Sequence, residues 1–169
     1  MTNEIKTTEN MNTEVMPPEI VRETNEFVIM KDENGKFIRK AKFIDYSSFK
    51  AETKEEKIWL LELMSGDDEE NANGLKDHVG KQIVVQDIIT RTYDKINEDS
   101  GQQEFGVLTY LITPEKVAYV TSSKSVYFKV NEIMALFGRP DEEDWKNITV
   151  KVIKKKGKNG DIINIKMVG

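Results

Sequence analysis

The alternation of apolar and polar side chains predicts that most of the second half of the chain forms β-strands. β-Branched residues dominate residues 81–93, and apolar side chains alternate with polar ones over residues 147–155. Period-two patterns of this kind are typical of strands with one buried face. Five strands are expected in this half, over residues 81–93, 104–112, 116–121, 147–155 and 161–168.

A helix is expected between the third and fourth of these strands. Apolar side chains recur there at the spacing of one helix face, from Val126 to Phe137. Ser123 or Ser125 can cap the start of this helix, and Gly138 marks its end. The other connections are a polar loop over residues 94–103, a turn at 113–115 and a glycine-rich hairpin loop at 156–160.

The order of these elements predicts the fold. A strand, a long loop, two strands joined by a tight turn, a helix and a final hairpin follow one another in the order of an OB-fold. The fold class is therefore expected to be mainly β, a five-stranded OB-fold barrel with a helix between strands three and four. Residues 75–169 would form this barrel.

An extension precedes the barrel. Residues 26–45 have the pattern of a hairpin around the turn-rich segment 32–35, and a helix is expected from Thr53 to Gly66. Thr53 followed by Glu56 has the spacing of a capping box. Residues 27–74 are thus expected to be a hairpin-helix extension of the single domain 27–169.

Charge is distributed unevenly along a chain of 169 residues with a net charge of −5. Residues 1–26 hold six glutamates against one lysine and one arginine and lack any apolar periodicity, so we expect a disordered acidic tail. Two acidic blocks follow, at 67–70 and 141–144. From Lys146 onward, seven lysines face one aspartate. The acidic average therefore hides a basic C-terminal end.

Composition argues against catalysis. The chain has no cysteine and one histidine, His78, so thiolate chemistry and zinc sites built from Cys or His clusters are excluded. The segment from Gly74 to Gln82 has the wrong spacing for a phosphate loop. We therefore expect no enzyme, no cofactor and no metal site. No stretch reaches the ~18 apolar residues of a membrane span, and no signal peptide is visible, so the expected location is the cytoplasm.

The basic end coincides with a ligand-binding part of an OB-fold. Such folds bind oligonucleotides on the face of strands two and three, beside the loop that joins strands four and five. That loop is the most basic stretch of this chain, and tyrosines of the neighbouring strands could stack on bases. The candidate DNA-binding residues are Arg91, Tyr93, Tyr110, Tyr119, Lys124, Lys151, Lys154, Lys155, Lys156, Lys158 and Lys166. Both alternating sets of strand 104–112 are apolar, so the pattern does not assign its faces.

Two stretches, residues 105–112 and 118–128, resemble the single-stranded-DNA-binding proteins of bacteriophages and mobile elements of Gram-positive bacteria. The resemblance covers about residues 75–169. It implies an OB-fold protein that coats unpaired DNA during replication or transfer of the phage or element, as a monomer or a cooperative array. Replication or transfer proteins of a bacterial host cell are the further partners it suggests. Cellular single-strand-binding proteins end on a long acidic tail, whereas this chain ends on an expected strand, so tail-mediated recruitment of partners is not carried over to it.

The leading hypothesis from the sequence is a protein that binds single-stranded DNA without sequence specificity. The alternative is an OB-like protein-interaction module, an adaptor or inhibitor that acts through its acidic surfaces. Oligomeric state and the choice between DNA and RNA are left open by the sequence.

Overall fold

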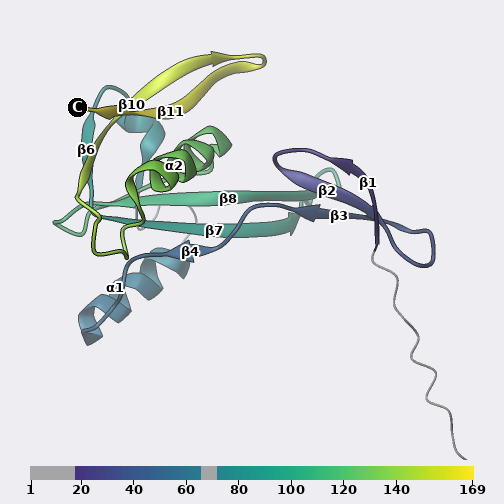
Figure 1. Cartoon of the computed structure of the whole chain (residues 1–169), viewed down its shortest axis with the longest axis horizontal. Helices are drawn as coiled ribbons and strands as arrows, with labels where there is room; N and C mark the ends of the chain where they lie inside the picture. The colour runs from purple at the N-terminus through teal and green to yellow at the C-terminus, as the bar shows by residue number, and fades with distance from the viewer. Residues whose placement is uncertain (1–17, 66–71) are drawn as a thin grey trace, which may run out of the picture. The chain divides into compact units, whose positions relative to one another are not determined.

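The computed structural model describes residues 18–65 and 72–169 (Figure 1). The chain divides into two compact units, with the boundary between Lys42 and Phe43. Most of the expected acidic tail, residues 1–17, and the acidic block at 67–70 lie outside the described residues.

The first unit contains a three-stranded antiparallel sheet. Its strands are β1 (Glu19–Glu23), β2 (Phe27–Lys31) and β3 (Phe37–Ala41), in that order. The hairpin of β2 and β3 is the one expected from the sequence. Its turn is closed by Asp32, whose Oδ1 accepts the backbone N–H groups of Asn34 and Lys36. Residues 19–23 differ from the expected disordered tail, because β1 pairs along β2.

The second unit contains two further sheets. The larger has the order β4 (Tyr46–Ser47), β7 (Asp87–Ile96), β8 (Gln103–Ile112), β9 (Ala118–Thr121) and β5 (Asn73–Gly74). The smaller has the order β11 (Gly160–Val168), β10 (Ile148–Gly157) and β6 (Gln82–Val85). All five strands expected in this half are therefore present. The loop expected at 94–103 is shorter, because β7 and β8 pair as far as Ile96 and Gln103.

The strand expected over residues 81–93 is divided between the two sheets. It breaks at Gln86, whose backbone N–H donates to the carbonyl of Ile112. The part before the break, β6, pairs with β10, and the part after it, β7, pairs with β8. The mainly β class is confirmed. Within the described residues the sheets do not close into a barrel, and β9 and β11 are not neighbours in a sheet.

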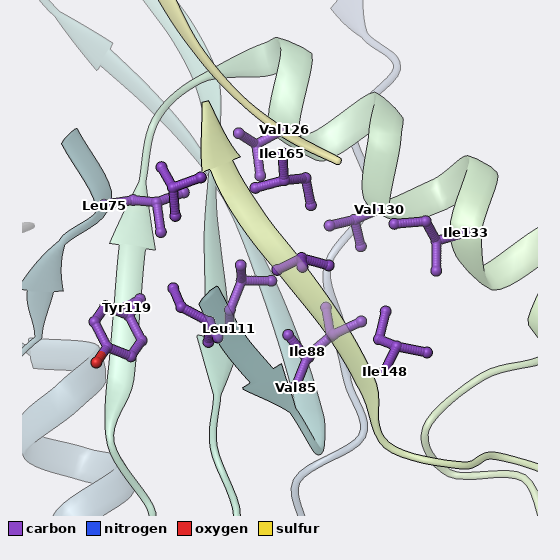
Figure 2. Packing of buried hydrophobic residues seen from close by; sticks show 13 residues of the cluster. Leu75, Val85, Ile88, Leu111, Tyr119, Val126, Val130, Ile133, Ile148 and Ile165 are labelled. Carbon is purple, nitrogen blue, oxygen red and sulfur yellow. The ribbon is translucent and has the colours of Figure 1, made fainter. Parts of the chain in front are cut away.

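Helix α2 (Lys124–Phe137) packs on one face of these sheets. Val126, Val130 and Ile133 of the helix are buried against residues of β10, β11 and β7, as Figure 2 shows. The helix ends at Gly138, whose positive φ of 85° is a backbone conformation that glycine adopts more readily than other residues. The start differs from the expectation that a serine caps it. Ser123 stands at the cap position, but its hydroxyl donates instead to the carbonyl of Ile163 in β11, at 2.6 Å.

Helix α1 (Lys54–Ser65) lies on the opposite side of the larger sheet from α2 (Figure 1). The expected capping box is present. Thr53 Oγ1 accepts the N–H of Glu56 at 3.1 Å, and Glu56 Oε2 accepts the N–H of Thr53 at 3.1 Å. Leu63 is 3% exposed and packs with apolar residues of β7, β8 and β9. The larger sheet is therefore covered on both faces.

Candidate nucleic-acid interface

The lysines near the turn of the β10–β11 hairpin, Lys154, Lys155, Lys156 and Lys158, are all exposed, and we call them the lysine hairpin. The antiparallel register divides them between two faces. Val150 and Val152 face the core, so by the two-residue period of a strand Lys154 and Lys156 continue that face beyond the core. Lys155 points to the opposite, outer face. The hairpin therefore presents positive charge on both sides.

Two further lysines lie opposite one another on the outer face. Lys151 of β10 is the direct partner of Lys166 of β11. Like charges placed directly across a sheet repel each other, and a bound anion would relieve that repulsion. Within the described residues neither these two nor the lysine hairpin form an ion pair or a side-chain hydrogen bond. Their charges are therefore available to a ligand such as a phosphate backbone.

Tyr93 lies across Gly106 of the neighbouring strand. The two residues are register partners in β7 and β8, and Tyr93 is half-buried. Lys95 Nζ lies 5.7 Å from the centroid of the tyrosine ring. A ring held on a glycine beside a cation is a suitable platform for an unpaired base.

Two other candidates share the face of Tyr93 but lie under or beside α1. Tyr110 is 1% exposed and belongs to the cluster that the helix covers. Arg91 is exposed, and its guanidinium donates to the carbonyl of Met64 in the last turn of α1. A cation at this position also complements the negative end of the helix dipole. The ring of Tyr110 is therefore covered and cannot stack on a base. Arg91 stabilises the C-terminal end of α1.

Tyr119 belongs to the other cluster, on the α2 side of the sheet. It is 5% exposed, and Figure 2 shows its hydroxyl oxygen pointing away from the labelled residues of that cluster. The hydroxyl accepts a hydrogen bond from Lys81 Nζ at 2.5 Å, and the ring of His78 meets the tyrosine ring edge-on. Lys81 was not among the sequence candidates, because nothing in the local pattern indicates that it meets a residue 38 positions away.

Lys124 is half-buried among aromatic rings that the sequence patterns did not connect. Its Nζ lies 5.8 Å from the ring centroids of both Phe43 and Phe105. Phe43 in turn packs edge-on against Tyr127, with ring centroids 5.3 Å apart. The sequence shows that each of these positions is apolar. It does not show that the rings meet, because they come from three separate segments of the chain. Lys124 thus extends positive charge to the start of α2.

The acidic block at 141–144 is used within the fold. Asp141 Oδ1 accepts a hydrogen bond from the hydroxyl of Tyr46 at 2.6 Å, which lowers the pKa of the aspartate. Burial, followed by this bond, raises the pKa of Tyr46.

In residues 18–65 and 72–169, no cluster of His, Asp or Glu side chains could hold a metal ion. None of the described helices is long and apolar enough to cross a membrane.

Comparisons with known proteins agree with one another. The model of a family described as "Phage Single-stranded DNA-binding protein" matches residues 39–167, more than half of the chain. The single-stranded DNA-binding protein of Bacillus phage GA-1 is 39% identical over 171 residues, which span 100% of this chain and 97% of that protein. No solved structure matches.

Proposed function

Because the chain belongs to the phi29-type family of phage single-stranded DNA-binding proteins, we propose that it coats unpaired DNA in an infected bacterial cell, without sequence specificity and without catalysis. Family membership favours this hypothesis over an adaptor acting through acidic surfaces. The main support for the position of the DNA contact site is the lysine hairpin. Its four lysines are exposed and have no ion-pair partner in the described residues.

The fold supports an OB-type interpretation. The order β6–β7, β8, β9, α2, β10 and β11 is that of an OB-fold with its helix between strands three and four. The first strand of such a fold is shared between two sheets here, as β6 and β7. In an OB-fold the hairpin of strands four and five lies at the rim that contacts oligonucleotides, so this interpretation assigns that position to the hairpin of β10 and β11. We interpret the second unit as a partly open OB barrel.

The proposed contacts divide into phosphate and base contacts. Exposed lysines neutralise phosphates and release counterions, so they supply affinity that does not depend on sequence. Tyr93 supplies a stacking platform, which is tolerant of sequence because every base has a π-face. Lys124 and Arg91 extend the basic surface along the same unit. Tyr110 is omitted from the proposed contacts because α1 covers it.

Fluorescence anisotropy with a labelled oligothymidine tests this proposal. The variant K154A/K155A/K156A/K158A should bind more weakly, and the slope of log K against log salt should shrink by about 0.7 for each phosphate that the variant no longer neutralises. Matched duplex DNA should compete poorly with the single strand. RNA of the same length tests whether the 2′-hydroxyl affects binding.

The matched control replaces four exposed lysines elsewhere, K36A/K40A/K54A/K57A, which changes the net charge equally. This control should keep the salt slope of the native protein. Equal decreases of affinity in both variants would mean that only net charge matters. An unchanged slope in the hairpin variant would remove the lysine hairpin from the interface.

A further inference from the structure

The sheet face that an OB-fold normally offers to nucleic acid is covered in this protein. Leu63 of α1 packs with Leu108 and Ile112 of β8 and with Val120 of β9, on the outer side of strands two and three of the barrel interpretation. The side chains of α1 would have to leave this cluster before a base could reach it. Tyr93, which packs against this cluster, is only half-buried, so the rest of a bound strand needs another surface.

The outer face of the smaller sheet offers one. Gln82 of β6 is the register partner of Lys151 in β10, which is in turn the partner of Lys166 in β11. All three side chains point away from the core residues Ile83, Val150 and Ile165, because adjacent strand residues face opposite ways. They form one polar and basic row across three strands, beside the lysine hairpin.

This row ends at a hollow beside β6. β6 is an edge strand, because it pairs with β10 on one side only. The hollow lies between its other side and the turn that joins β8 to β9. The hollow has a volume of about 320 Å³. That volume lies near the small end of the range of small-molecule sites, about 300–1,000 Å³. It is suited to one nucleotide rather than to a folded partner.

The lining of the hollow matches a nucleotide. Val84 and Val117 are 43% and 37% exposed, and with Pro114 they give an apolar wall for a base or a sugar. Lys81 supplies a cation, held at 2.5 Å from the hydroxyl of Tyr119. The carboxylate of Glu115 also lines the hollow, where it would accept from a base amino group and disfavour a second phosphate.

We propose that this hollow holds one nucleotide of the bound strand, which runs from the lysine hairpin along the row Lys166, Lys151 and Gln82 to Lys81. The path crosses the outer face of β11, β10 and β6 and leaves α1 in place. This inference rests on the proposed binding of single-stranded DNA and specifies the surface that carries it.

Lysine acetylation of the full chain, with and without oligothymidine, maps the path by mass spectrometry. DNA should protect Lys81, Lys151 and Lys166, whereas Lys57 on α1 should react equally in both states. Protection of the lysine hairpin with no protection of Lys81 would overturn the path and leave the proposed function standing. No protection of any lysine, together with no anisotropy change, would overturn both.

Filling the hollow gives an independent test. V117W should weaken oligothymidine binding about 5- to 150-fold, the equivalent of one base contact. The control L136W adds the same ring to a residue of α2 that is 79% exposed and away from the hollow, and it should bind as the native protein does. Native affinity in a folded V117W would overturn the proposal.

A second variant covers the case in which V117W does not fold. K81A removes a single exposed cation and should reduce the salt slope of binding by about 0.7. Y119F keeps the ring and removes the hydroxyl that positions Lys81, so it should lower affinity less than K81A does. A salt slope unchanged in K81A would contradict a phosphate contact at the hollow.

Discussion

The ring of Tyr93 occupies the space that a side chain at position 106 would need. A Cβ atom built on Gly106 would lie 2.4 Å from Oη of Tyr93 and 2.5 Å from its Cζ. Tyrosine and glycine are register partners on neighbouring strands. An aromatic ring laid over a cross-strand glycine compensates for the missing side chain and fixes the position of the ring.

Gly106→Ala should therefore displace the ring of Tyr93 and weaken single-stranded DNA binding. If one stacked base is lost, the cost is about 1–3 kcal/mol, and anisotropy titration measures it. Tyr93→Phe keeps the ring and should keep most of the affinity. A G106A protein that binds oligothymidine as the native protein does would exclude Tyr93 as a stacking platform.

Glu56 should make the stability of α1 depend on acid pH. The ammonium of Lys116, followed by the backbone N–H groups of Thr53 and Glu52, lowers the pKa of Glu56 from 4.5 to about 2. The stabilisation is complete above the unfolded pKa of 4.5 and is lost as the pH falls through about 2. Urea unfolding between pH 2 and pH 7 should show Glu56→Gln less stable than native at pH 7 and equal to it near pH 2.

Glu55→Gln is the matched control, since it removes the same charge from the adjacent helix position. Its difference from the native protein should not follow the same pH profile. Identical profiles for the two variants would assign the effect to net charge and not to the capping box.

Replacing Thr109 with valine should make the folded protein more stable. Its Oγ1 is buried and has no hydrogen-bond partner in the described part of the chain. An unpaired buried hydroxyl is costly, so Thr109→Val should raise the free energy of unfolding by about 1 kcal/mol. The cross-strand partner Thr90 donates to the carbonyl of Ile44 at 2.7 Å, so Thr90→Val should have the opposite sign. Thermal unfolding of both variants checks this; equal signs would contradict it.

Ser123 should matter more than Ser125 for stability. The Ser123 hydroxyl joins the start of α2 to β11 through the carbonyl of Ile163, and Ser123→Ala leaves that carbonyl without its donor. The expected decrease in the free energy of unfolding is about 1 kcal/mol, or roughly 2–4 °C in Tm for a chain of this size. Ser125→Ala should change Tm much less. Similar decreases in the two variants would indicate helix propensity as the cause.

The sequence determined the features that depend on neighbouring residues. Period-two and period-3.6 patterns are local, so they identified both helices and the segments that form β6 to β11, but not the two-residue strands β4 and β5. The capping box of Thr53 and Glu56 and the end of α2 at Gly138 depend on residues within four positions, and both were predicted. The lysine hairpin was visible for the same reason, because its charge is contiguous.

Tertiary structure decided which face each strand buries and which distant residues meet. Both faces of β8 are apolar, and only the docking of Leu63 shows that Tyr110 is covered from outside while Leu111 faces the other core. The hydroxyl of Ser123 bonds to a carbonyl of β11 instead of its own helix, and Lys81, next to β6 of the smaller sheet, meets Tyr119 of the larger sheet. Such choices minimise the exposed apolar area and the unpaired polar groups of the whole chain. A local pattern contains no information about a partner that folding brings from elsewhere in the sequence.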